Sequence, residues 1–187
     1  ICTGTALQAE QAQDSARLQG YELEVAPKSI TIRSLTPTGL FYGLLTLSQL
    51  EKGRQIPCVK VKDTPRFPYR GLMIDCSRHF WTKKFIMKQL DAMAYFKLNR
   101  FHWHLTDGGG WRMEVKQYPR LTNETAYRTQ SDWVKWWMGK DRKYCPVGTP
   151  GAYGGYYTQQ DIKDIVRYAA ARHITVIPEI EMPGHSD

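Results

Sequence analysis

Short apolar stretches that end in ionisable residues alternate with helix-like patterns across the larger, C-terminal part of the sequence. The stretches read GLMIDCS (71–77), RFHWHLTD (100–107) and ITVIPEI (174–180). Amphipathic periodicity fills the intervals at 82–98 and 158–173, and Thr158 and Asp161 have the spacing of a capping box. The buried stripes expected for the two helices consist of Ile86, Leu90, Met93 and Ala94, and of Ile162, Ile165, Val166, Ala169 and Ala170. Alternating strands and helices predict parallel strands joined by right-handed crossovers, so we expect an α/β fold.

The residues at the ends of these stretches indicate which α/β architecture to expect. In a (β/α)8 barrel the C-terminal ends of the strands share one face, and that face carries the chemistry. A doubly wound open sheet also gathers its strand ends, but no Gly-x-Gly-x-x-Gly follows the first stretch. We therefore predict a TIM barrel with its site at the ionisable residues that follow the three stretches: Asp75, Arg78, His79, Asp107, Glu179, Glu181 and His185.

The N-terminal part has a different pattern, which predicts a second domain. YELEVAP and SITIRSL predict a hairpin that turns at 27–29, and 36–53 predicts a helix. The apolar face expected for that helix consists of Leu40, Leu44, Leu47 and Leu50. A charged, proline-containing segment follows, so we place the domains at 1–62 and 63–187. A barrel needs about 250 residues, so only about three of its strands are expected here.

Composition excludes several classes of function. The net charge of +8 raises the possibility of nucleic-acid binding, but Lys and Arg are scattered without a run of five, which favours a solvated basic surface. No apolar stretch approaches 18 residues, so we predict no membrane span. The four cysteines show no C-x-x-C spacing, which argues against a zinc site and leaves disulfides undecided: Cys2, Cys58, Cys76 and Cys145.

Four segments resemble the β-N-acetylhexosaminidases, family 20 of the glycoside hydrolases. They read YRGLMIDCSRHF, RFHWHLTDGGGW, GGYYTQQDIKDIVRYAAARHI and PEIEMPGHSD, and they occur in the family's order and spacing over 69–187. The residues before them look like the end of the small α+β domain that precedes the barrel in this family. The resemblance implies a hydrolase that removes terminal β-linked N-acetylglucosamine or N-acetylgalactosamine from glycans, with no metal or other cofactor.

The resemblance also implies a retaining, substrate-assisted mechanism, in which the 2-acetamido oxygen of the sugar attacks the anomeric carbon. The family's catalytic Asp-Glu pair follows its fourth strand, so we expect the pair just beyond this sequence. Residues 1–187 alone are therefore expected to be inactive and poorly soluble or associated. Family enzymes are commonly exported, so the periplasm or the extracellular space is expected, while the sequence leaves the oligomeric state open.

Four residues match supporting positions of the family. Asp107 and His185 match a pair that lies behind the general acid and helps to set its pKa. Arg70 is assigned to the family arginine that holds hydroxyls 3 and 4 of the terminal sugar, for which a forked guanidinium is suited. Glu181 lies where the family usually has an acidic residue, whereas Glu179 could equally be a structural partner for an arginine of the barrel.

An alternative function is suggested by His102 and His104, which strand alternation places on one side with Trp103 opposite. A His-x-His pair on a barrel strand is typical of metal-dependent amidohydrolases, although there it belongs to the first strand and here to the second. We therefore favour a packing or site-lining role for these histidines.

The long connection between the second and third stretches departs most from the family. Many members have a second Asp after the residue that Asp107 matches, whereas here Gly108 follows, which puts the local hydrogen bonding in doubt. A connection of about fifty residues is far longer than a usual loop, which indicates a function. Its tryptophans could stack on sugars, but packing on the barrel rim is favoured for Trp133, Trp136 and Trp137.

Overall fold

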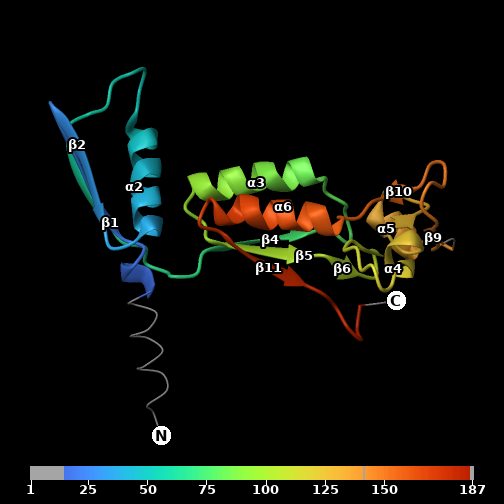
Figure 1. The fold of residues 1–187 in the computed structure, drawn as a ribbon. Coiled ribbons are helices and arrows are strands. Elements are labelled where there is room, and N and C mark those ends of the chain that lie inside the picture. Colours follow the sequence, from blue (N-terminus) through green and yellow to red (C-terminus); the bar gives the residue numbers. More distant parts are fainter. Residues whose placement is uncertain (1–14, 141, 186–187) are drawn as a thin grey trace, which may run out of the picture. The chain divides into compact units, whose positions relative to one another are not determined.

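A computed structural model describes residues 15–140 and 142–185, which form two compact units. The first unit comprises the residues up to Arg70 together with Tyr95–Lys97, and the second comprises Gly71–Ala94 and the residues from Leu98 onward. Figure 1 shows a sheet packed beside a helix in the first unit and a sheet covered by helices on one side in the second.

The sheet of the first unit contains the expected hairpin and one further strand. β1 (Tyr21–Ala26) pairs antiparallel with β2 (Ser29–Ser34), which confirms the hairpin prediction. On the other side of β1, β3 (Val59–Asp63) also pairs antiparallel. Sequence reasoning missed β3 because its alternating lysines make VKVKD look like part of a charged linker.

Helix α2 (Pro37–Leu50) packs on this sheet through a face that differs from the predicted one. Its N-cap is Thr36, whose hydroxyl accepts a hydrogen bond from the Gly39 amide at 3.2 Å. The predicted apolar face is wrong in part, because Leu40 and Leu44 are exposed. The buried face consists instead of Gly39, Tyr42 and Gly43.

The glycines on the buried side of α2 explain why the helix packs through a different face from the predicted one. A Cβ atom at Gly43 would lie 2.6 Å from Cγ2 of Ile32, so only glycine allows the helix to approach the sheet this closely. The core of the first unit lies at this contact and contains Tyr21, Leu23, Val25 and Tyr42.

The second unit contains three parallel strands, as the sequence predicted. β5 (Arg100–His104) lies in the centre, between β4 (Gly71–Asp75) and β11 (Thr175–Glu179). The register aligns Asp75, His104 and Glu179 in one row at the C-terminal ends of the strands.

Two helices cover one face of this sheet (Figure 1). They are α3 (Lys83–Tyr95) and α6 (Gln159–Ala170), and α6 begins with the predicted capping box between Thr158 and Asp161. The predicted stripe of α3 is confirmed, because Ile86, Leu90, Met93 and Ala94 are all buried. The buried stripe of α6 is narrower than predicted and includes Ile165 and Ala169, whereas Val166 is exposed.

The opposite face of the sheet is much less covered. Phe101 and Trp103 are buried, whereas Met73 and Ile177, which share a row with His102 on the other face, are 52% and 36% exposed. The first stretch is therefore not buried on both faces in the part of the chain that the structure describes. β5 has one well-covered face, whereas Leu72, on the same side of β4 as Phe101, is still 36% exposed.

The connection between β5 and α6 is built from short elements. β6 (Thr106–Asp107) and β7 (Gly110–Trp111) form a small hairpin. A second small sheet has the order β10-β8-β9, with bounds Tyr153–Gly154, Tyr127–Arg128 and Tyr144–Cys145. Helices α4 (Arg120–Asn123) and α5 (Trp133–Met138) complete it. Among the described residues, no helix is long and apolar enough to span a membrane.

Candidate active site at the strand ends

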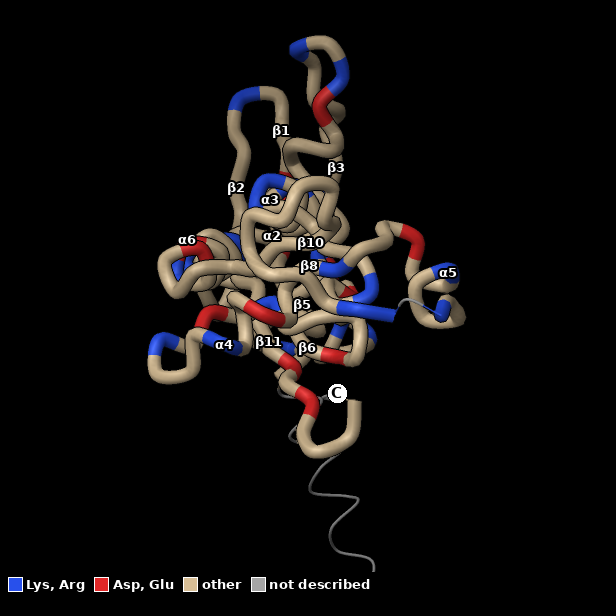
Figure 2. The backbone as a smooth tube through the Cα atoms, turned by 90° about the vertical axis from the view of Figure 1, so that its right-hand side faces the viewer, with Lys and Arg blue, Asp and Glu red and all other residues tan. Residues whose placement is uncertain are grey.

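Ionisable side chains gather where β4, β5 and β11 end. Figure 2 views the molecule from this side, and acidic segments lie beside the labels of β6 and β11. The row of Asp75, His104 and Glu179 belongs to the less covered face of the sheet. Parallel strands that share a register bring these residues together although more than 100 positions separate the first from the last.

Asp75 and Arg78 shape the chain directly after β4. Oδ1 of Asp75 accepts hydrogen bonds from the amides of Ser77 and Arg78 at 2.9 and 3.0 Å, which turns the chain away from the sheet. The guanidinium of Arg78 then folds back, and its Nη1 lies 2.8 Å from Oδ2 of Asp75. The Arg78 side chain remains 31% exposed, so part of its surface is open to a ligand.

Asp107 is the centre of the cluster. Its side chain is only 6% exposed, and its Oδ2 lies 2.6 Å from Nη2 of Arg78 and 2.9 Å from Nδ1 of His185. Its Oδ1 accepts the Gly108 amide at 2.7 Å. The hydrogen bond and charge of Asp107 raise the pKa of His185, because a nearby carboxylate favours the protonated imidazole.

His104 lies buried beneath this cluster. Its Nε2 is 3.6 Å from Oδ2 of Asp107 and 3.9 Å from Oε1 of Glu181, and within the described residues it has no hydrogen-bond partner. Its Nδ1 faces Nη1 of Arg78 at 3.5 Å and Oδ1 of Asp75 at 3.7 Å. The imidazole therefore packs between the two carboxylates that Arg78 joins.

Glu179 and Glu181 occupy the end of β11. Glu179 hydrogen-bonds Nε2 of His102 at 2.5 Å, and although burial opposes it, hydrogen bonds with Glu181 and His102 lower the pKa of Glu179. The amide of Glu181 donates to the Thr106 hydroxyl at 2.7 Å. Glu179 is thus a partner of His102, whereas the structural alternative predicted an arginine as its partner.

Among the described residues, the side chains that lie close enough together to hold a metal ion are one imidazole and two carboxylates. Ligand atoms of His104, Glu179 and Glu181 lie within 4.8 Å of one another. The predicted His-x-His pair does not converge in this group, because Nε2 of His102 bonds Glu179 instead. The arrangement does not match the two-metal site of an amidohydrolase.

The glycine run after Asp107 fits the close packing at this point. A Cβ at Gly109 would lie 2.9 Å from the carbonyl oxygen of Ser77, and Gly110 has a φ of +145°. The Ser77 hydroxyl in turn donates to the carbonyl of Gly110 at 2.9 Å. The local hydrogen bond to Asp107 comes from the Gly108 amide.

The structure brings together three of the four residues predicted for the site. Asp107 and His185 are in contact, and Glu181 lies near them through His104. Arg70 is not brought to them, because it precedes the opposite, N-terminal end of β4 and belongs to the first unit.

Arg70 donates hydrogen bonds to residues of the first unit. Its Nε donates to the Lys97 carbonyl at 2.8 Å and its Nη1 to the Phe67 carbonyl at 2.7 Å. Its Nη2 donates to Gln19 and to the Tyr42 hydroxyl at 2.9 and 3.1 Å. The arginine at the strand ends is Arg78, which sequence reasoning noted but did not assign; the signal was its position directly after β4.

The tryptophans of the long connection differ in their surroundings. Trp136 is buried, and its Nε1 donates to the Lys143 carbonyl at 3.0 Å, which agrees with the predicted packing role. Trp137 is 41% exposed, and its ring lies 3.6 Å from the guanidinium carbon of Arg142. Trp133 is half-buried, and its ring lies 5.9 Å from the guanidinium carbon of Arg78.

The cysteines described by the structure are not paired. Cys58, Cys76 and Cys145 are free thiols, whereas Cys2 lies outside the described residues. Burial raises the pKa of the Cys76 thiol, which accepts hydrogen bonds from Trp103 and Tyr157 and therefore acts as part of the core.

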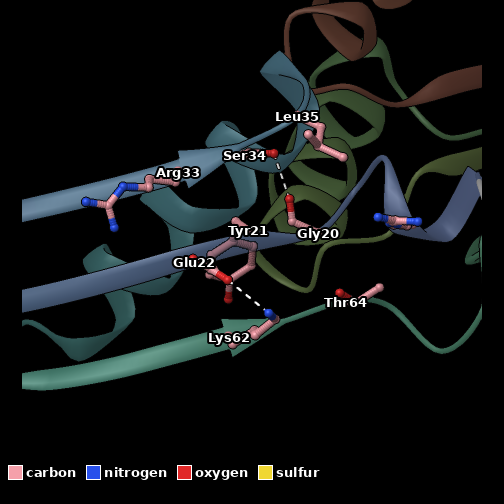
Figure 3. A pocket seen from close by; sticks show the side chains of 9 residues that line it. Gly20, Tyr21, Glu22, Arg33, Ser34, Leu35, Lys62 and Thr64 are labelled. Atoms are coloured by element: carbon pink, nitrogen blue, oxygen red, sulfur yellow. Dashed lines mark hydrogen bonds and ion pairs between the residues drawn. The ribbon is translucent and has the colours of Figure 1, made fainter.

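A separate pocket lies in the first unit, at the end of its sheet (Figure 3). It has a volume of about 350 Å³, and its lining includes Glu22, which pairs with Lys62 at 3.0 Å. The Ser34 hydroxyl donates to the Gly20 carbonyl beside it at 2.6 Å. These contacts hold the sheet together, and the pocket does not contain the residues predicted for the site.

Comparison with known proteins places both units in one enzyme family. The model of the glycosyl hydrolase family 20 catalytic domain matches residues 67–187, and that of the family's domain 2 matches residues 3–64. A beta-hexosaminidase of Porphyromonas gingivalis is 44% identical over 179 residues, which are 90% of this chain and 21% of that protein. A beta-hexosaminidase of Akkermansia muciniphila is 40% identical, over 96% of this chain and 34% of that protein.

Solved structures give the same result. A GH20 exo beta-N-acetylglucosaminidase from Vibrio harveyi, in complex with N-acetylglucosamine, superposes with a TM-score of 0.76 at 37% identity, covering 89% of this chain and 26% of that one. A beta-N-acetylhexosaminidase from Bacteroides fragilis gives 0.74 at 37% identity, with 89% and 32% covered. The chain thus spans about a fifth to a third of the length of these relatives. Because the catalytic-domain model alone matches well over half of the sequence, the chain belongs to glycosyl hydrolase family 20.

Proposed function

We propose that this chain is part of a glycoside hydrolase that removes terminal β-linked N-acetylhexosamine from glycans with retention of configuration. The observation that carries the proposal is the buried Asp107, which binds both Arg78 and His185 at the C-terminal ends of parallel strands. The family membership and the Vibrio harveyi structure with N-acetylglucosamine support this class of substrate.

The sheet of the second unit supports a (β/α)8 barrel as the framework of the whole enzyme. Its strands are parallel, and α3 and α6 cover one face, as the helices on the outside of a barrel would. The less covered face carries Met73, His102 and Ile177 and would become the barrel interior when further strands close it. In this arrangement Asp75, His104 and Glu179 end at the catalytic face.

Asp107 and His185 would support a general acid. The carboxylate fixes Nδ1 of His185 and favours its protonated form, which leaves Nε2 as a donor toward a neighbouring carboxyl group. We propose that the general acid and the carboxylate that orients the acetamide come from a later part of the protein. Three carboxylates of the cluster are already bound, Asp75 and Asp107 by Arg78 and Glu179 by His102. The fourth, Glu181, lies 3.9 Å from the buried imidazole of His104.

Arg78, rather than Arg70, is proposed to bind the hydroxyl groups of the terminal sugar. Two carboxylates fix its guanidinium from one side, and its 31% exposed side chain leaves donors for a ligand. A planar fork held in this way is suited to two adjacent hydroxyls. The Arg70 guanidinium, by contrast, is bound within the first unit.

Hydrolysis of 4-nitrophenyl N-acetyl-β-D-glucosaminide by the protein expressed from its whole reading frame tests the proposal. We expect release of nitrophenol, with the β-anomer of N-acetylglucosamine as first product in proton NMR. The matched 4-nitrophenyl β-D-glucoside, which lacks the acetamido group, should be cleaved far more slowly. Absence of cleavage, or the α-anomer as first product, would refute the proposal. Activity that disappears with a chelator and returns with a metal would favour the metal-dependent alternative.

A further inference from the structure

Arg128, at the end of β8, has a fully buried side chain whose guanidinium donates hydrogen bonds to main-chain oxygens. Its Nη2 donates to the carbonyls of Arg78 and Ser131 at 2.8 and 2.9 Å. Its Nη1 donates to the Gly109 carbonyl at 3.2 Å, and its Nε donates to the Gln130 carbonyl at 2.7 Å. Among the described residues, no carboxylate forms an ion pair with it.

Such a burial of charge is unfavourable unless the surroundings replace the lost water. Burial lowers the pKa of Arg128, which expresses this cost. The carbonyl dipoles supply part of the compensation, and aromatic faces supply more. The guanidinium carbon lies 5.5 Å from the ring of Trp133, 5.6 Å from that of Trp136 and 5.1 Å from that of Tyr153. The side chain therefore has one well-defined position.

The chain segments that Arg128 joins are those that carry the central ion pair of the site. One is the main chain of Arg78, whose own guanidinium lies 2.6 Å from Asp107. The other is the turn after Asp107, held at the carbonyl of Gly109. One buried guanidinium thus fixes the backbone on both sides of the Arg78–Asp107 contact.

We infer that Arg128 is a positioning residue, which holds Arg78 against Asp107 so that the Arg78 guanidinium is preorganised for the substrate. The inference rests on the proposed function in that Arg78 contacts the sugar. Lysine could not replace Arg128, because a single ammonium group cannot reach carbonyls that lie along three edges of a planar guanidinium. A side-chain amine would lose the bond to the Arg78 carbonyl or the bond to the Gly109 carbonyl, and in the second case the Gly109 carbonyl would keep only its bond from Arg112.

A double-mutant cycle between Arg128→Lys and Arg78→Lys tests this inference in the protein expressed from its whole reading frame. In the wild-type background we expect Arg128→Lys to lower kcat/KM for the nitrophenyl N-acetylglucosaminide by about 10- to 100-fold, because small displacements of a binding group are costly. Most of the loss should appear as a raised KM. In the Arg78→Lys background the same substitution should change kcat/KM less than about twofold, because the group it positions is already lost. Equal losses in both backgrounds would overturn the inference and leave Arg128 a purely structural residue.

Two further measurements separate this inference from the proposed function. Arg120→Lys is the matched control, because Arg120 is 84% exposed and its guanidinium pairs with Glu124 at 2.7 Å. It should leave kcat/KM unchanged. Amide hydrogen exchange reports the positions of the segments without any substrate. Arg128→Lys should accelerate exchange at residues 78–80 and 108–110 more than in α3 and α6. If the wild type cleaves no N-acetylhexosaminide, the proposed function fails, and the exchange pattern still decides on the positioning; unchanged or uniformly faster exchange would overturn it.

Discussion

Replacing Arg112 by Met removes the second buried guanidinium of the long connection and gives a large, calculable effect on stability. The Arg112 side chain is fully buried, and burial lowers its pKa to about 10, so it stays charged at neutral pH. It donates hydrogen bonds to five main-chain carbonyls, those of Cys76, Ser77, Gly109, Ala126 and Gly155.

The magnitude follows from the carbonyls that would lose their donor. Gly109 also accepts a bond from Arg128, and Ala126 accepts one from the Gly155 amide, so these two keep a partner. The described part of the chain offers no other donor to the carbonyls of Cys76, Ser77 and Gly155. An unsatisfied buried acceptor costs about 1–3 kcal/mol. Allowing for some relaxation and entry of water, we expect a loss of about 3–5 kcal/mol, which is much of a typical domain stability of about 5–15 kcal/mol.

Equilibrium urea unfolding, followed by tryptophan fluorescence, measures this loss in the protein expressed from its whole reading frame. Trp103 and Trp136 are buried in the second unit and report its transition. Arg120→Met is the control, because its pair with Glu124 is exposed to solvent and contributes little to stability. A loss below about 1 kcal/mol for Arg112→Met, or equal losses in the two variants, would refute the assignment of these carbonyls to Arg112.

Three further predictions concern the site. Asp107→Asn removes the charge that binds Arg78 and His185, so we expect kcat for the N-acetylglucosaminide to fall about 10²-fold. An unchanged kcat would contradict the supporting role of Asp107. In the same variant the pKa of His185, followed by NMR titration, should fall toward its ordinary value near 6.5, because the Asp107 contact raises it. Because the pKa of His185 is raised in the folded protein, its contact with Asp107 stabilises the fold at a pH below the ordinary pKa, and this stabilisation is lost as the pH rises through the raised value. Thermal melts across that pH range should therefore show the wild type losing its stability advantage over His185→Gln. A difference in melting temperature that stays constant with pH would contradict the prediction. Gly109→Ala would place a Cβ 2.9 Å from the Ser77 carbonyl oxygen, so we expect the free energy of unfolding in urea to fall by about 1–3 kcal/mol and the activity to fall as well. Wild-type stability in this variant would show that the turn can shift to accommodate the methyl group.

The sequence predicted much of the secondary structure because the relevant patterns are local. The buried stripe of α3 follows from apolar spacing, and the start of α6 follows from the Thr158–Asp161 capping box. The hairpin of β1 and β2 follows from two alternating stretches around a short turn. β3 escaped prediction because its partner strand is distant in sequence and its own residues are half charged.

The candidate site could be predicted only in part. Asp107 and His185 were found because they match a family motif, and the structure places them in contact. Arg70 and Arg78 stand before and after the same strand, so either could be chosen on sequence alone. Which of them meets Asp107 depends on how the chain folds back after β4, and the hydrogen bonds of Asp75 to the following amides direct that turn.

By itself, the sequence determined the strand and helix order, the family motifs and the chemistry available at the strand ends. Only the tertiary structure decided which side chains share a carboxylate and which face of α2 is buried. It also decided that Arg112 and Arg128 are buried and bind main-chain carbonyls around the long connection. The physical reason is that propensity, capping and periodicity act over a few residues. Ion pairs and the burial of charge instead depend on distances between segments that only the register of the sheet brings together.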